Sequence, residues 1–256
     1  MAQDSSNISC PAEAWKAEYV KEFESIGLAR DFPCTFLRPA YQAGHIKFHF
    51  MGDPGDEAQR RAGYAAIRDY VQDVLATEDD GTAALKILLV VVNADAISGP
   101  HEDAAWSLLN DFAAMDPVPW PSEVPTDPNS ESWAYCISGA RLFVNISSPE
   151  HVKRRSRNLG RHLVLVVQLR DGVDFIAPPN EDGDAVRRSM RRRVAAYDTV
   201  PVSPDLATHG QGTNRDWKQF WLGDRTTTHE GQCPFNRHTV EREKGVDVER
   251  EKGVKS

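Results

Sequence analysis

A dense group of cations follows a predicted strand near the middle of the chain. Four of the five residues at 153–157 are Lys or Arg, and the apolar segment before them, 143–149, ends in a proline. The Arg guanidinium keeps its charge and donates paired hydrogen bonds that suit carboxylates and phosphates. Loops at strand ends often carry function. The pattern therefore predicts a binding site for an anionic group, formed by Arg154, Arg155 and Arg157.

The direction of each side chain in this run decides which residues share a role. If the run is extended, successive side chains alternate in direction, so we expect Arg155 and Arg157 to face the ligand and Arg154 to face the fold. Asn145 and Asn158 could hydrogen-bond the same group, and either could instead fix its own turn. The alternative interpretation of the cations is a solvated face or a network of salt bridges.

The other chemistry-bearing residues are dispersed. The eight histidines include one pair at i, i+4 spacing, His45 and His49, which a strand would hold ~13 Å apart. The four cysteines form no CxxC pair, so no disulfide framework is expected, and Cys10 and Cys136 are interpreted as small buried side chains. The usual nucleotide-binding, acyl-transfer and zinc-protease motifs are absent.

Hydrophobic periodicity predicts the elements that would position the site. Apolar residues at helical spacing predict helices, and alternating or continuous apolar runs predict strands. Their order indicates a single α/β (α+β) domain, with a mixed sheet of five to six strands and helices packed on it. The predicted helices cover 11–24, 57–76, 102–115 and 184–197, and the predicted strands cover 46–50, 85–93, 133–137, 141–146 and 162–169.

Two of these helices have a clear apolar stripe that predicts the buried face. Helix 102–115 is expected to bury Ala105, Trp106, Leu109 and Phe112. Helix 184–197 is expected to turn inward Val186, Met190, Val194 and Tyr197.

Charge and hydropathy restrict the partners. The net charge is −8, yet residues 151–200 carry eleven basic residues against six acidic ones. The overall balance argues against nucleic-acid binding, while the basic region is compatible with a small anion. No apolar run approaches the ~18 residues of a membrane span, and no signal-peptide pattern is visible. We therefore expect no membrane association and a cytoplasmic location.

Several short motifs occur in an order that resembles the YqcI/YcgG family. Phe32-Pro-Cys34 lies near the start, Cys233-Pro-Phe235 near the end, and the segment 143–160 contains Phe-Val-Asn-Ile-Ser-Ser-Pro followed by Arg-Arg-Ser-Arg-Asn-Leu-Gly. The resemblance implies a family domain over 13–238. It leaves a flexible N-terminus at 1–12 and a charged tail at 239–256, which its near lack of apolar residues predicts to be disordered.

The resemblance implies an activity. Characterised members are haem-dependent enzymes that hydroxylate a nitrogen of an amino acid, guanidine or amine, so haem is the expected cofactor. Cys34 is then the first candidate for the iron ligand and Cys233 the second, because a thiolate favours O–O cleavage. The cations and asparagines named above would meet haem propionates or a substrate carboxylate. The chain departs from the family pattern at Leu169-Arg170-Asp171 and Thr208-His209-Gly210, which leaves the substrate open.

Other functions stay open from the sequence alone. A monooxygenase would need electrons from a partner reductase or a peroxide, because nothing in the chain resembles a flavin or nicotinamide site. The alternatives are a non-enzymatic binder, with Cys34 and Cys233 brought together around zinc or haem, or a small-molecule sensor that uses the basic site without redox chemistry.

Overall fold

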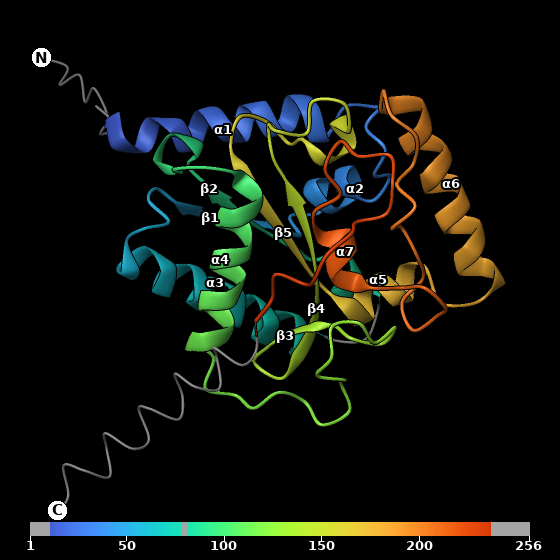
Figure 1. Ribbon diagram of the computed structural model, residues 1–256. Coiled ribbons are helices and arrows are strands. Elements are labelled where there is room, and N and C mark those ends of the chain that lie inside the picture. The colour runs from blue at the N-terminus through green and yellow to red at the C-terminus, as the bar shows by residue number, and fades with distance from the viewer. Residues whose placement is uncertain (1–10, 78–80, 237–256) are drawn as a thin grey trace, which may run out of the picture.

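A five-stranded mixed sheet forms the centre of the protein (Figure 1). The computed structural model describes residues 11–77 and 81–236. The strand order is β1-β2-β5-β4-β3, with β1 and β2 parallel and the other pairs antiparallel. The predicted single α/β domain with a mixed sheet is confirmed. The strands are β1 (Ile46–Met51), β2 (Ile87–Val92), β3 (Tyr135–Ile137), β4 (Ala140–Ser147) and β5 (Leu163–Leu169).

Seven helices in the described residues surround this sheet. All four predicted helices are present, with ends that differ by three residues or fewer. The three that the sequence did not predict, α2, α5 and α7, have five to seven residues and are too short to show a helical period. The helices are α1 (Pro11–Gly27), α2 (Leu37–Gln42), α3 (Glu57–Leu75), α4 (His101–Met115), α5 (Arg170–Ile176), α6 (Glu181–Tyr197) and α7 (Asp216–Phe220).

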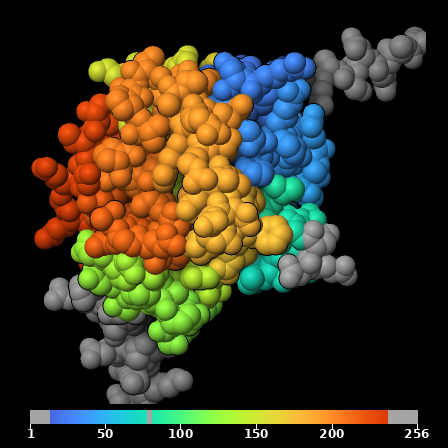
Figure 2. Space-filling view, turned by 90° about the vertical axis from the view of Figure 1, so that its right-hand side faces the viewer, coloured from blue at the N-terminus to red at the C-terminus, as the bar shows by residue number. Residues whose placement is uncertain are grey.

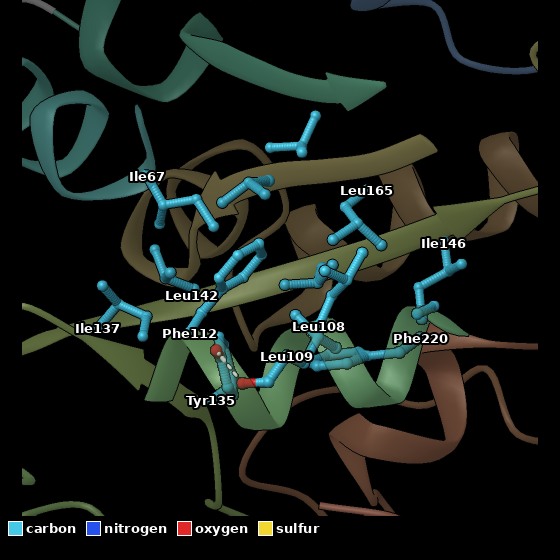
Figure 3. Packing of buried hydrophobic residues seen from close by; sticks show 14 of the residues in the cluster. Ile67, Leu108, Leu109, Phe112, Tyr135, Ile137, Leu142, Ile146, Leu165 and Phe220 are labelled. Carbon is cyan, nitrogen blue, oxygen red and sulfur yellow. Dashed lines mark hydrogen bonds between the residues drawn. The ribbon is translucent and has the colours of Figure 1, made fainter. Parts of the chain in front are cut away.

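One face of the sheet packs against α3 and α4 to form the larger core (Figure 3). Strand β4 directs Leu142, Val144 and Ile146 to this face, all fully buried. The predicted apolar face of α4 is confirmed, since its four residues are at most 4% exposed. In this core Tyr135 donates its hydroxyl to the carbonyl of Leu109 at 2.7 Å, which satisfies a polar atom among apolar side chains.

The other face carries a smaller core that covers only part of the sheet. Tyr19 and Phe23 of α1 pack with Leu37 of α2 against Leu89 and Val166 of the strands. At β4 this face changes character. Because side chains alternate along a strand, the positions opposite the larger core are Phe143, Asn145 and Ser147, with Gln168 beside them on β5. Because three of these four side chains are polar, they do not pack into a hydrophobic core. All four line a cavity instead.

Helix α6 forms the outer wall of that cavity. Figure 2 shows the atoms of the α6 region and the following segment, in orange, covering this side of the molecule. Sequence periodicity predicted an inward stripe on α6, and Val186, Met190 and Val194 do point inward, but they line the cavity and none is fully buried. Tyr197 packs against Phe32, with ring centroids 5.7 Å apart. The stripe therefore faces inward, as predicted, and what it meets there is a ligand-sized cavity.

Parts of some predictions fall outside the described residues. These include most of the N-terminal segment 1–12, of which only 11 and 12 are described as the start of α1, and the whole charged tail at 239–256. Within the part of the chain that is described, no helix has the length and apolar character needed to cross a membrane.

Candidate functional site

The cavity between the sheet and α6 has a volume of about 330 Å³. This lies within the range of small-molecule sites, which are mostly apolar with a few placed polar groups. Its walls come from the segment around Phe32, from β4 and β5, from α5 and α6, and from residues 206–209. The polar and sulfur-bearing lining residues are Cys34, Asn145, Ser147, Ser156, Arg157, Gln168, Arg170, Asp174, Arg187, Arg191, Thr208, His209 and Gln219.

Strand β4 runs along the cavity and gives it two chemically different ends. Phe143 and Ser147 are four residues apart, which in a strand is roughly 13 Å. At the Ser147 end, the next residue's N–H donates to the carbonyl of Arg157 at 2.9 Å, so Arg157 belongs to this end. At the other end, the Arg170 guanidinium lies over the Phe143 ring, 4.6 Å from its centroid. These are called the Arg157 end and the Arg170 end below.

Arg157 is a buried cation that lacks a hydrogen-bond partner. The residue is 7% exposed, and its Nη1 atom is buried with no hydrogen-bond partner among the described residues. Burial, together with repulsion from Arg154, lowers the pKa of Arg157 to about 9, against the opposing attraction of Asp198. A guanidinium with that pKa is still charged at neutral pH. Since an unpaired buried charge is costly, this end of the cavity is suited to an anion that would complete its hydrogen bonds.

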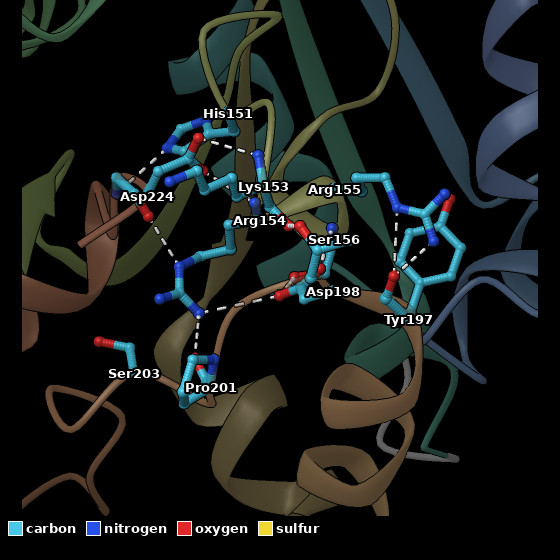
Figure 4. A network of polar contacts seen from close by, with 12 residues as sticks. His151, Lys153, Arg154, Arg155, Ser156, Tyr197, Asp198, Pro201, Ser203 and Asp224 are labelled. Atoms are coloured by element: carbon cyan, nitrogen blue, oxygen red, sulfur yellow. Dashed lines mark hydrogen bonds and ion pairs between the residues drawn. The ribbon is translucent and has the colours of Figure 1, made fainter. Parts of the chain in front are cut away.

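Arg154 is fully buried and its donors are used inside the protein (Figure 4). It donates to the carbonyls of Gly223, Pro201 and Arg225 at 2.7, 3.1 and 2.8 Å, and lies 3.7 Å from Asp198. It does not line the cavity. The arrangement ties the C-terminal segments to the centre of the chain, as the alternative interpretation of the basic run had it.

Arg155 points away from the cavity. Its side chain is exposed, stacks on the Tyr197 ring at 4.6 Å and donates to the Tyr197 carbonyl (Figure 4). The sequence analysis assumed an extended run, and this was wrong, because Arg155–Arg157 is a turn of 3₁₀ helix. In such a turn residues i and i+3 lie on the same side. Arg154 and Arg157 therefore share the buried side, and Arg155 takes the outer one.

The two candidate asparagines also have different surroundings. Asn145 lines the cavity from β4. The Asn158 Oδ1 atom accepts the Gly160 N–H at 3.0 Å, which fixes the turn after the basic run, and Asn158 does not line the cavity. A turn-fixing role had been the alternative for each of them.

The two candidate cysteines lie on different sides of the sheet. Cys34 lines the cavity and packs with the smaller core, whereas Cys233 packs against the larger core. The structure thus does not bring them together, and the described residues contain no group of three or more His, Cys, Asp or Glu that could hold a metal ion. Burial raises the pKa of the Cys34 thiol, opposed by hydrogen bonds from the Phe36 and Leu37 N–H groups. Two N–H donors aimed at a sulfur also suit a metal-bound thiolate.

Sequence reasoning missed a buried polar cluster at the Arg170 end. Asp216, fully buried at the start of α7, accepts hydrogen bonds from Arg170 Nη2 at 2.6 Å and Asn214 Nδ2 at 3.0 Å, and lies 3.1 Å from His209 Nδ1. Arg170 and Asp216 are 46 positions apart in the sequence. The residues around a single aspartate contain no pattern that predicts so distant a partner. The only signal was that the resemblance in the motifs had marked the segments Leu169-Arg170-Asp171 and Thr208-His209-Gly210 as departures from the family pattern.

Asp174 completes the Arg170 end. Its side chain is 28% exposed and lies 3.6 Å from Arg170 Nη1, which is longer than a hydrogen bond. Burial raises the pKa of Asp174, and the attraction of Arg170 and His209 offsets this only in part. The nearby positive charges therefore do not fully offset the cost of burying this carboxylate. A further cation in the cavity would stabilise its charged form.

The protein thus has an α/β fold with a cavity beside the sheet, and this cavity has polar groups of opposite charge at its two ends. More particularly, the chain belongs to the YqcI/YcgG family, whose model matches residues 23–236. This confirms the resemblance seen in the motifs.

Three relatives cover most of the chain. A Streptomyces lavendulae protein provisionally named N(omega)-hydroxy-L-arginine synthase DcsA is 37% identical over 86% of this chain and 84% of its own length. The Bacillus subtilis proteins YqcI and YcgG, both named as uncharacterized, are 30% and 29% identical over 80% and 83% of this chain, and over 80% and 84% of their own lengths. No solved structure matches the chain significantly.

Proposed function

We propose that this protein is a haem-dependent oxygenase that hydroxylates a nitrogen of an arginine-like amino acid or a small guanidine. The observation that carries the proposal is the 37% identity, over 86% of the chain, to a relative named for the synthesis of N(omega)-hydroxy-L-arginine. The cavity supports it, because a substrate with a carboxylate and a cationic nitrogen has groups that match the two ends of the cavity.

The residues around the cavity fit a haem in three respects. Apolar side chains from α6 and the sheet would contact a flat hydrophobic ring. The unpaired buried guanidinium of Arg157 would bind a propionate. Cys34 lines the cavity and is a side chain of a type that ligates haem iron. When bound, haem would supply the oxygen activation that no protein side chain provides.

The chain's own residues have separate tasks in this proposal. Cys34 is the expected iron ligand, held by the N–H groups of Phe36 and Leu37. Arg157 binds a carboxylate, either of a haem propionate or of the substrate, with charge-assisted hydrogen bonds worth ~1.5–3 kcal/mol each. The wall formed by α6 excludes water from the reacting groups. A partner reductase supplies the two electrons that the reaction with dioxygen needs, or a peroxide supplies oxygen that is already reduced.

Absorption and product mass test this proposal together. The protein is expressed with a haem precursor, and a Soret band is expected after purification. Incubation with arginine, dioxygen and a reductant, or with peroxide, is expected to give a product heavier by one oxygen atom. Absence of the Soret band from protein that is folded by circular dichroism would contradict the haem assignment. A Soret band without any oxygenated product from arginine or a small guanidine would contradict the activity.

A non-catalytic binder is the second candidate, favoured by the same Arg157 site. The unpaired Arg157 cation would bind a carboxylate in the cavity whether or not chemistry follows. Retention of haem or arginine with no turnover under either electron source would support this function over the enzyme.

A further inference from the structure

The Arg170 end of the cavity contains a polar atom that neither the fold nor the proposed haem site uses. His209 has a side chain that is 8% exposed, and its Nδ1 atom lies 3.1 Å from the Asp216 carboxylate. A carboxylate only accepts hydrogen bonds, so the proton of this contact is on Nδ1. In the neutral ring the second nitrogen, Nε2, then presents a lone pair, and it has no partner among the residues that the structure describes, although His209 lines the cavity.

The charges at this end favour a cation. Arg170 is the permanently charged basic group in the cluster around Asp216, which also contains the His209 ring, and it faces two carboxylates. Asp216 is 2.6 Å from its Nη2 and Asp174 is 3.6 Å from its Nη1. Asp216 is fully buried behind the cavity wall, while Asp174 lines the cavity itself. With the His209 ring neutral, the two carboxylates outnumber the one guanidinium by one negative charge, and the Asp174 carboxylate is the one that lines the ligand space.

The Arg170 guanidinium is not free to bind an anion in place of a cation. Its plane is stacked on Phe143 and its two terminal nitrogens are directed to Asp216 and Asp174. Its Nε atom is buried without a partner, but the two carboxylates that face the terminal nitrogens would repel an anion at this guanidinium. Nearby Arg187 also lines the cavity, but its donors go to Asp184 and to the carbonyls of Ala177 and Pro178.

We propose that Asp174 and His209 together bind the cationic guanidine or amine group of the substrate, with Asp174 forming the ion pair and His209 Nε2 accepting a hydrogen bond. Asp216 is the positioning residue, since it orients the His209 ring. The proposal deepens the proposed function, because it names the residues that select a positively charged nitrogen. It rests on that function for the class of substrate, but its test measures binding and not turnover.

Three ligands of nearly the same shape separate the contributions of the two ends. Arginine carries both a carboxylate and a guanidinium, citrulline replaces the guanidinium with a neutral urea, and agmatine lacks the carboxylate. Each is titrated calorimetrically into the full-length protein, in the haem-loaded and the haem-free forms. Arginine is expected to bind at least tenfold more tightly than citrulline, because a partly buried ion pair of ~1.4 kcal/mol corresponds to tenfold in affinity.

Substitutions then assign the preference to residues. Asp174→Asn is expected to remove most of the tenfold preference for arginine while changing citrulline binding by less than about twofold. His209→Phe is expected to weaken arginine binding severalfold, and His209→Gln, which restores an acceptor, to recover part of it. Asp171→Asn is the matched control, since Asp171 is on the same helix, is exposed, pairs with Arg141 and does not line the cavity.

Two outcomes would overturn the proposal. One is equal affinity of the wild-type protein for arginine and citrulline, which needs no variant and so does not depend on variants folding. The other is an Asp174→Asn protein that keeps its wild-type melting temperature and its preference for arginine. A preference that requires Asp174, in a protein that takes up no haem or makes no product, would contradict the proposed function and leave this inference standing.

Discussion

Three arginines of one short run have three different surroundings, and this decides what each can do. Arg154 is fully buried with its donors used by carbonyls, Arg155 stacks on an exposed ring, and Arg157 is buried with a terminal nitrogen left unpaired. The residue type is the same at all three positions. Only the third is available to a ligand in the cavity.

The first prediction separates these roles. Arg157→Gln is expected to weaken binding of haem or arginine by at least tenfold, since it removes a charge-assisted hydrogen bond. Its effect on unfolding free energy is expected to be small or stabilising, because a costly unpaired charge is removed. Arg154→Gln is expected to lose about 3–5 kcal/mol of stability by breaking a buried network. Titration and urea denaturation measure the two quantities.

Arg155→Ala serves as the surface control for that experiment. The exposed, stacked side chain contributes about 0.5–1 kcal/mol to stability at most. Because Arg155 does not line the cavity, ligand affinity is expected to stay within about twofold of wild type. If Arg157→Gln loses stability without losing affinity, the anion site is not at Arg157.

The second prediction concerns the iron ligand. In haem-loaded protein, Cys34→Ser is expected to abolish the red-shifted Soret band that a thiolate ligand gives to the ferrous carbon monoxide complex. Cys233→Ser is expected to keep that band, because Cys233 packs against the other face of the sheet. Survival of the band in Cys34→Ser, together with its loss in Cys233→Ser, would move the ligand to Cys233.

At the scale of elements, α6 shows how a helix can have a clear apolar stripe without belonging to a core. Its inward residues Val186, Met190 and Val194 contact the cavity, whereas the equivalent stripe of α4 is packed on all sides. Hydrophobic spacing identifies the inward side of a helix. It does not show whether that side meets protein or an empty space, because this depends on the residues that the sheet presents opposite.

The third prediction follows from this difference in packing. Met190→Ala is expected to cost about 1 kcal/mol of stability or less, because few protein atoms surround its side chain on the cavity side. Leu109→Ala on α4 is expected to cost ~2–5 kcal/mol, as is usual in a close-packed core. Met190→Ala is also expected to weaken ligand binding, and Leu109→Ala to leave it unchanged once folding is allowed for. Equal destabilisation by the two changes would mean that α6 is packed as tightly as α4.

At the scale of the whole molecule, several buried histidines link stability to pH. Burial lowers the pKa of His49, His151, His162 and His229. The largest resolved effect is at His151, where burial and then Arg157 lower the pKa to about 4. His151 is 1% exposed, accepts the Gly223 N–H at 3.2 Å on Nε2 and lies against the Trp221 ring.

The fourth prediction is an acid limb of stability that depends on His151. The unfolded chain takes up a proton near pH 6.5, whereas the folded protein resists it down to about pH 4. The unfolded state therefore binds more protons in this window, and stability falls as pH drops from 6.5 to 4. For His151 alone the loss is on the order of 3 kcal/mol.

His151→Gln is the variant that checks this effect. Glutamine can keep an acceptor for the Gly223 N–H but does not titrate. Its urea-derived unfolding free energy is expected to fall less between pH 7 and pH 4.5 than that of wild type. Parallel curves for the two proteins over that range would show that His151 is not the group responsible.

Much of the architecture could be read from the chain. The strands are marked by apolar alternation and the four long helices by stripes of three to four turns, because these patterns come from the geometry of a single element. The short helices α2, α5 and α7 could not be predicted, since five to seven residues contain fewer than two turns and a periodic stripe needs more. The 3₁₀ turn at Arg155–Arg157 was missed for the same reason, and with it the directions of the three arginines.

By itself, the sequence determined the single α/β domain, the mixed sheet, the family and the presence of a basic segment next to β4. Only the tertiary structure decided which of those cations is free, because satisfaction of a guanidinium depends on carbonyls 47 to 71 residues away. It also decided that Asp216 holds both Arg170 and His209, and that α6 closes over polar strand residues to leave a cavity. The spacing of residues along the chain does not predict contacts between distant segments. The candidate site could therefore be identified only once the fold was known.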